Sequence, residues 1–119
     1  MSVFSSHLSE VRNHLDEFKK NPNTSYLDSM DKVIVEHMKK LDLEFGVETK
    51  EFQELKQYKE VLHSISMLIV NARKAGTGSN ELEGIGDQIE EKIKEAHNLI
   101  YDVESLIRKE FGVAHKFLE

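Results

Sequence analysis

Histidine and carboxylate side chains are the groups in this 119-residue sequence that could bind a metal ion. Helical metal centres of the di-iron type need a glutamate and a histidine three residues apart, both facing the interior of the bundle. Glu60 and His63 have this spacing, but at about 100° per residue they point away from the apolar stripe of their own segment. His7 and His14 flank another apolar stripe and supply only two ligands. We therefore expect no metal site.

Paired acidic residues raise a second possibility, which is magnesium chemistry. Glu51 and Glu54 lie three residues apart, as do Asp28 and Asp31. This arrangement resembles the all-α nucleotide pyrophosphatases, which hold magnesium with Glu-x-x-Glu on one helix and Glu-x-x-Asp on the next, although here the order is reversed and one Glu is replaced. The resemblance implies a metal-dependent pyrophosphatase, which we keep as an alternative. Magnesium needs oxygens that converge from facing helices, and at most one of Glu51 and Glu54 approaches the interior.

The sequence offers no serine, histidine and acid in the local setting that nucleophilic catalysis needs. Such a serine usually stands on a strained turn beside a glycine-rich oxyanion loop. The glycine-rich stretch Gly76-Thr77-Gly78-Ser79 lacks the Lys-Ser/Thr ending of a phosphate loop and follows no predicted strand, so we interpret it as a connector. Our main expectation is a protein that is not an enzyme and has no cofactor.

Residues 82–93 carry an apolar-Gly-apolar-Gly pattern followed by apolar positions at helical spacing, in the stretch Leu82-Glu83-Gly84-Ile85-Gly86-Asp87-Gln88-Ile89-Glu90-Glu91-Lys92-Ile93. This twelve-residue stretch resembles the helix-hairpin-helix DNA-binding motif. The resemblance implies that backbone amides of Gly84 to Gly86 face a DNA phosphate. It departs from the motif at Glu83, where proline is usual, and residues 81–91 hold five acids and no base. A DNA-associated protein is a second alternative function.

Composition and charge narrow the class of partner. The chain has a formal net charge of −6 and a pI of about 5.5, which argues against nucleic acid as the main partner because phosphate-backbone binders are basic. It contains no cysteine, which excludes disulfides and thiolate sites. No stretch approaches the ~20 apolar residues of a membrane span, and the first residues lack a basic region followed by an apolar one. We expect a cytoplasmic protein with no membrane partner.

Apolar residues recur every three to four positions over four segments, which predicts four helices at residues 2–20, 25–45, 48–75 and 80–111. Pro22, Gly46 and Gly112 stand where three of these helices should end. Four amphipathic helices with short connections predict a single all-α domain over residues 1–119, an antiparallel up-down four-helix bundle with a longer C-terminal helical hairpin. His37 lies on the apolar flank of the second helix, so we expect it to be a hydrogen-bonded packing residue.

The predicted lengths indicate where a partner would bind. The last two helices exceed the first two by roughly 10 Å at ~1.5 Å per residue, and most of that overhang should fall at the glycine-rich connector. Five aliphatic residues there should be only half covered, and exposed apolar patches mark partner sites. These candidate partner-binding residues are Leu68, Ile69, Val70, Leu82 and Ile85.

These observations favour an interaction protein. We expect a small acidic helical protein that acts by binding another protein, as an adaptor, inhibitor or immunity-type protein does. The partner is another protein or a second copy of the chain in a homodimer, because two-fold pairing is the commonest symmetric arrangement.

Overall fold

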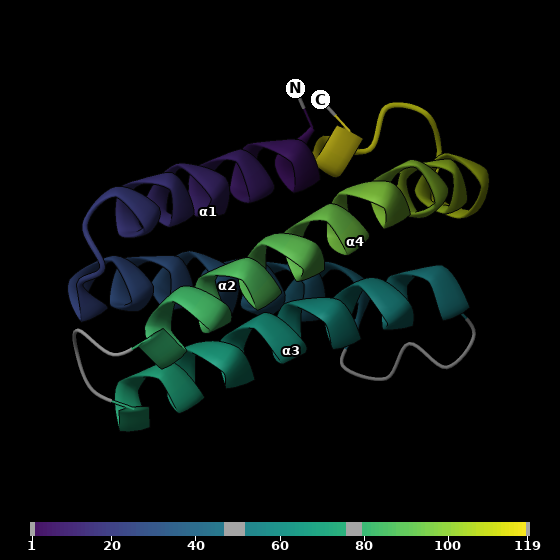
Figure 1. The fold of residues 1–119 in the computed structure, drawn as a ribbon. Helices are drawn as coiled ribbons and strands as arrows, with labels where there is room; N and C mark the ends of the chain where they lie inside the picture. Colours follow the sequence, from purple (N-terminus) through teal and green to yellow (C-terminus); the bar gives the residue numbers. More distant parts are fainter. Residues whose placement is uncertain (1, 47–51, 76–79, 119) are drawn as a thin grey trace.

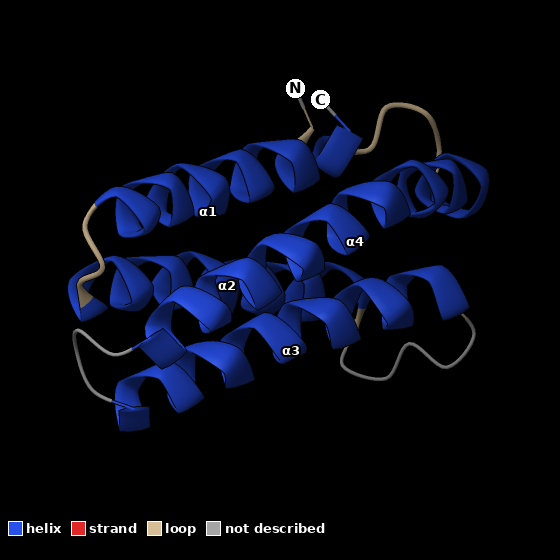
Figure 2. Cartoon of the chain, in the orientation of Figure 1, coloured by secondary structure: helices blue, strands red, loops and turns tan. Residues whose placement is uncertain are grey.

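A computed structural model describes residues 2–46, 52–75 and 80–118 of the chain and shows an all-α fold (Figure 1). Every regular element in these ranges is helical (Figure 2). The four long helices and a terminal 3-10 turn, η1, are α1 (Val3–Lys20), α2 (Thr24–Phe45), α3 (Gln53–Ala75), α4 (Asn80–Phe111) and η1 (Lys116–Leu118). Consecutive helices contact one another and α1 also contacts α4, which confirms the predicted up-down four-helix bundle.

The helix ends follow from local chemistry. Ser2 caps α1, because its Oγ accepts a hydrogen bond from the backbone N–H of Ser5 at 3.2 Å. Asn23 caps α2 in the same way, through its Oδ1. Gly46 and Gly112 end α2 and α4 with φ values of 88° and 101°, a backbone conformation that residues with a Cβ rarely adopt. The stops predicted at these two glycines are therefore confirmed.

Two predicted boundaries need comment. The third helix begins at Gln53 rather than near residue 48, and Phe52 precedes it without helical structure. The remaining residues of that predicted start, 48–51, and the predicted connector, 76–79, lie outside the described residues. The extra length of the C-terminal hairpin belongs mainly to α4, which has 32 residues, whereas α3 has 23 and α2 has 22.

The predicted overhang of α3 is wrong. Arg73, in the last turn of α3, pairs at 2.6 Å with Asp28, the fifth residue of α2, so these two helix ends lie at nearly the same level. On the other side, Gly86 of α4 lies against the ring of Phe18, in the last turns of α1. Both contacts hold the hairpin alongside α1 and α2. A stagger between helices depends on such contacts, and helix lengths alone do not determine it.

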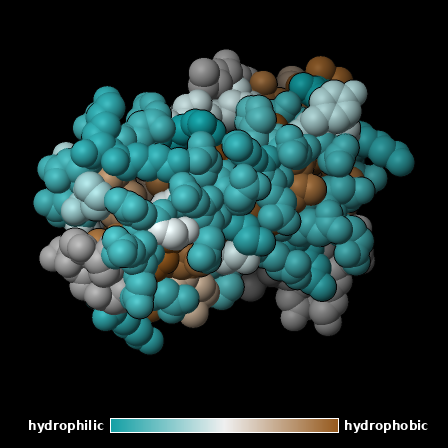
Figure 3. All heavy atoms as spheres, viewed as in Figure 1, coloured by the Kyte–Doolittle hydropathy of each residue, from teal (hydrophilic) through white to brown (hydrophobic). Residues whose placement is uncertain are grey.

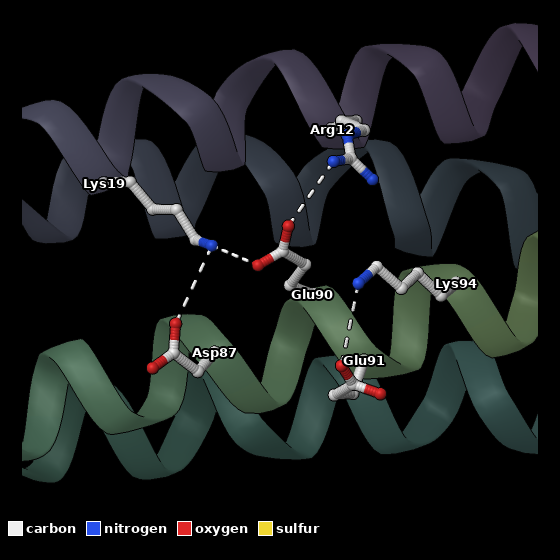
Figure 4. Close-up of polar contacts among 6 residues, drawn as sticks. All are labelled: Arg12, Lys19, Asp87, Glu90, Glu91 and Lys94. Carbon is white, nitrogen blue, oxygen red and sulfur yellow. Dashed lines mark hydrogen bonds and ion pairs between the residues drawn. The ribbon is translucent and has the colours of Figure 1, made fainter.

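Ion pairs close the seam between α1 and α4 (Figure 4). Lys19 bonds Glu90 and lies 3.7 Å from Asp87, while Arg12 approaches Glu90 at 3.4 Å. The hydrogen bond with Lys19 lowers the pKa of the Glu90 carboxyl and raises that of the Lys19 ammonium. Part of the acidic stretch 81–91 is thus neutralised by α1.

Candidate functional site

A surface groove runs along the outer side of the helical pair α3 and α4. It consists of two hollows, of about 590 and 390 Å³, which adjoin because both are lined by Ser64 and Lys92. We call this surface the α3–α4 groove. Figure 3 shows the face that carries α4: most of it is hydrophilic, and hydrophobic atoms surface in several small patches, one of them between α4 and α3.

The groove arises from helical spacing on both walls. On α3, Val61, Ser64 and Leu68 recur at intervals of three and four residues, which places them on one face. The wall from α4 follows the same rule in the residues Gln88, Lys92, Glu95, Leu99 and Asp102, and it also includes Glu91 and Asn98. Each helix therefore turns one mixed polar and apolar stripe toward the groove while its apolar stripe faces the core.

The groove has an apolar floor. Val61 is buried, and Leu68 and Leu99 are partly buried and pack against the core. Met67 stands beside them with 47% of its surface exposed, one of few large apolar side chains so exposed in the described residues. A partner that removes this apolar strip from water lowers the free energy of the complex.

The rims of the groove are acidic. Glu60 of α3 and Asp102 of α4 both line the larger hollow, and neither has an ion-pair partner among the described residues. Glu95 also lines this hollow and accepts a hydrogen bond from Lys92 at 3.2 Å, so the one lysine of the groove is already paired. Glu91 lines the smaller hollow. The groove therefore presents net negative charge around an apolar floor.

The chain was compared with protein-family models, with curated proteins and with solved structures, and none matches. What the protein does is therefore inferred from its own surface and chemistry. None of the helices in the described ranges combines the length and apolar character that crossing a bilayer requires.

The five predicted partner-binding residues separate into two groups. Leu68 lines the α3–α4 groove, and Val70 and Ile85 are also only partly buried. Ile69 and Leu82, by contrast, are 0% exposed and belong to the core, so the expectation that they present half-covered surface is wrong. The reason is the absent overhang of α3. That Leu68, Val70 and Ile85 bind a partner stays a prediction.

The helix-hairpin-helix interpretation is wrong. Residues 80–111 form one continuous helix, and neither Gly84 nor Gly86 has a positive φ. Only the first four amides of a helix lack a partner within it, so the amides from Gly84 onward are used by α4 itself. They are not free to bind a phosphate, and the DNA-associated alternative loses its structural basis.

Two of the acids considered for magnesium, Asp28 and Asp31, form polar contacts between α2 and α3. Asp28 pairs with Arg73, and Asp31 accepts a hydrogen bond from Ser66 at 2.8 Å. Glu51 lies outside the described residues, and Glu54 is only partly buried. Within the described ranges, no three His, Asp or Glu residues are grouped closely enough to hold a metal ion. The pyrophosphatase arrangement is therefore not assembled by the residues that the structure describes.

His37 is a packing residue, as its position predicts. It is buried, and its Nε2 lies 2.7 Å from the hydroxyl of Tyr58 on α3. The His7 ring stacks on it at 4.3 Å between centroids. Burial, followed by the charges of His7 and Lys40, lowers the pKa of His37 to about 3, and burial also raises the pKa of Tyr58. The pair is closed to solvent and is unavailable to a substrate.

A Glu–His pair holds the tail that follows α4 against α2. This pair was not identified from the sequence. The carboxylate of Glu44 accepts hydrogen bonds from His115 Nε2 at 2.8 Å and from Lys116 Nζ at 2.7 Å. The Lys116 bond is the main cause of the lowered pKa of Glu44. His115 Nδ1 accepts the backbone N–H of Phe117, so both ring nitrogens are occupied. No ring nitrogen is left to activate a nucleophile. The pair therefore has a structural role, which is to hold the C-terminal tail against α2.

Proposed function

We propose that the protein is a non-enzymatic binding module that takes a basic amphipathic helix of a partner protein into the α3–α4 groove. The observation that supports this is the combination of an apolar floor with acidic rims in one elongated groove. Helix-in-groove recognition uses apolar anchors on one face of the bound helix, flanked by charges. Here the anchors would cover Val61, Leu68 and Leu99, and flanking Lys or Arg side chains would pair with Glu60 and Asp102.

The dimensions suit a short helix. The groove extends along α3 from Gln57 to Asn71, which is about 21 Å at ~1.5 Å per residue. A bound helix of ~14 residues, or about four turns, would fill it. The apolar floor would supply most of the affinity, while the acidic rims would set orientation and speed the encounter of oppositely charged surfaces.

Charge favours a partner over a second copy of the chain. Two-fold pairing through this groove would bring the rims of two copies together, with Glu60 and Asp102 of each copy facing like charge. Like charges across an interface oppose association. A basic partner instead relieves the repulsion among these acids. This is consistent with an adaptor or inhibitor role for an acidic protein of net charge −6.

A synthetic amphipathic peptide tests the proposal. The probe is a ~16-residue helix with leucines on one face and lysines beside them, titrated into the protein by calorimetry. We expect Glu60→Lys with Asp102→Lys to weaken its binding about tenfold, since two exposed charge pairs are lost and reversed. The control is Glu10→Lys with Glu36→Lys, which changes net charge equally at exposed positions on α1 and α2.

The control should lose much less affinity than the groove variant. A peptide in which every lysine is replaced by glutamate should not bind. Equal losses for the two double variants would show that binding follows net charge and not this groove, and would contradict the proposal. Amide shifts confined to residues away from Ser64 and Lys92 in a nuclear magnetic resonance titration would contradict it as well.

A further inference from the structure

A separate hollow of about 400 Å³ lies beside the start of α1. Figure 1 shows that η1 lies next to this end of α1. The walls of the hollow come from the first turn of α1, the last two turns of α2 and the C-terminal tail, in the residues Val3, Lys40, Leu43, Glu44, Lys116 and Phe117. We call it the terminal pocket. It involves α1 and α2, the two helices that do not line the α3–α4 groove.

The terminal pocket exposes unusual apolar surface. Leu43 is 88% exposed, the highest value among the large apolar side chains of the described residues. It stands as a ridge beside Val3 and the buried Phe117. An exposed leucine at the edge of an apolar hollow provides a contact site for a bulky side chain, because both surfaces leave water together.

The walls of the pocket are held in place. Glu44 accepts hydrogen bonds from His115 and Lys116, which fixes the tail against α2. Phe117 packs against Phe4 and Phe45, with ring centroids 5.7 and 5.1 Å away. A pocket with fixed walls loses little conformational freedom when it is filled, which favours binding.

The charge at this rim is opposite to that of the α3–α4 groove. Lys40 and Lys116 line the pocket, and no described residue forms an ion pair with Lys40. Glu44, the acid of the lining, is already bonded to two donors, and the neighbouring Asp42 is bonded to Lys59 of α3. The lysine at position 40 is therefore available to an external carboxylate.

We propose that the terminal pocket is a second interaction surface, which binds a partner segment that carries a bulky apolar side chain next to acidic residues. The apolar side chain enters between Val3, Leu43 and Phe117, and a neighbouring carboxylate pairs with Lys40. In the chain's own acidic stretch, 81–91, Leu82 and Ile89 are buried in the core and Ile85 is partly buried. The occupant that we propose is a segment of another protein. This inference does not rest on the proposed function of the α3–α4 groove.

The two surfaces differ in position and in sign of charge. A protein with an acidic groove on one helical pair and a basic-rimmed pocket on the other can hold two unlike segments without competition. That arrangement is the chemistry of a small adaptor, which joins a basic helix and an acidic segment.

The experiment uses a fluorescein-labelled acidic peptide with a single central phenylalanine, titrated into the full chain by fluorescence anisotropy. We expect Leu43→Ser and Lys40→Gln to weaken binding about tenfold when combined, because they remove the apolar ridge and the free ammonium. The matched control combines Tyr101→Ser and Lys32→Gln, which alter an exposed aromatic and an exposed lysine elsewhere. The control should bind within about twofold of the unchanged protein.

Circular dichroism checks that both double variants remain folded, which the exposure of Leu43 and Lys40 leads us to expect. Three results would overturn the proposal. The first is undiminished binding by Leu43→Ser with Lys40→Gln. The second is stronger binding of decanoate than of the peptide at the same residues, which would indicate a pocket for an anionic amphiphile. The third is a dimer in sedimentation that Leu43→Ser dissociates, which would make this face a self-interface.

The same variants distinguish binding at the α3–α4 groove from binding at the terminal pocket. Glu60→Lys with Asp102→Lys should leave binding of the acidic peptide intact, and Leu43→Ser should leave binding of the basic helix intact. If the acidic peptide fails to bind while the basic helix binds, the terminal pocket proposal is wrong and the groove proposal stands. If the basic helix fails to bind while the acidic peptide binds, the groove proposal is wrong and the terminal pocket proposal stands.

Discussion

The buried, neutral state of His37 couples the stability of the bundle to pH. Groups from three helices act on this ring: His7 of α1 stacks on it, Lys40 of α2 lies near it, and Tyr58 of α3 bonds it. The charge of Glu104 on α4 acts on Tyr58. In the unfolded chain the imidazole binds a proton below pH ~6.5. In the folded chain its pKa is about 3, so the unfolded state takes up the proton first.

The free energy of unfolding should therefore fall as the pH is lowered. The contribution of His37 is fully present above pH ~6.5 and decreases by about 1.4 kcal/mol for each pH unit below it. Urea unfolding measured between pH 7 and pH 4.5 will show this slope. His37→Gln, which replaces the ring with an uncharged amide, should flatten it, whereas His63→Gln at an exposed position should not. A variant slope equal to that of the original protein would mean that His37 is not the group involved.

Two glycines of α4 differ in what surrounds them. Gly84 and Gly86 both lie within the helix, where glycine is unfavourable relative to alanine because it has more conformational freedom to lose. A Cβ on Gly84 would meet nothing within 4 Å, but a Cβ on Gly86 would lie 3.2 Å from Cε1 of Phe18. Gly86 therefore permits the close approach of α1 to α4.

Alanine substitutions should separate these two roles. Gly84→Ala should raise the free energy of unfolding by about 0.5–1 kcal/mol, the usual gain from alanine in a helix. Gly86→Ala gains the same local preference but must displace the ring of Phe18, so its net gain should be smaller or negative. Chemical denaturation of both variants gives the comparison. Equal stabilisation by the two alanines would show that Phe18 moves aside without cost.

The sequence predicts the elements better than their relative placement. Three-to-four spacing, Pro22 and the glycines at 46 and 112 locate the helices, because these signals act within one segment. The stagger of α3 against α2 depends on Arg73 and Asp28, which are 45 residues apart. The contact between Glu44 and His115 likewise joins residues that are far apart in the sequence.

Sequence patterns also failed where tertiary contacts decide the outcome. The pattern around Gly84 and Gly86 suggested a hairpin, but the contact of Gly86 with Phe18 belongs to a continuous helix packed on α1. The α3–α4 groove was only partly predictable. Leu68 was identified from its place in the third helix, whereas the facing wall of Glu95, Leu99 and Asp102 could be named only once α4 was placed beside α3.

The whole molecule shares one core, which extends through all four helices and the tail in a bundle measuring 47 × 26 × 21 Å. Leu82 is 0% exposed within it, although it is only the third residue of α4. Leu68, on the neighbouring helix, borders the α3–α4 groove and is partly buried. Small single domains usually unfold as one unit, so damage at one core position affects every helix.

A charge introduced at Leu82 should unfold the entire bundle. Leu82→Asp buries an unpaired carboxylate in an apolar core, a cost of several kcal/mol, comparable to much of a domain's total stability of about 5–15 kcal/mol. Far-UV circular dichroism should show loss of most of the helical signal. Leu68→Asp, whose carboxylate can reach water from the groove, should stay helical. A folded Leu82→Asp would contradict the placement of this residue in the core.

The ring contact between Phe4 and Phe117 has a consequence for biosynthesis. Phe4 stands in the first turn of α1 and is fully buried, and one of the rings against it comes from the tail that follows α4. During translation, at ~5–20 residues per second, α1 leaves the ribosome long before its covering residues are made. The nascent chain must therefore expose the ring of Phe4 to water until Phe117 has emerged and can pack against it. Chaperones that bind exposed aromatic residues could bind this segment during that interval.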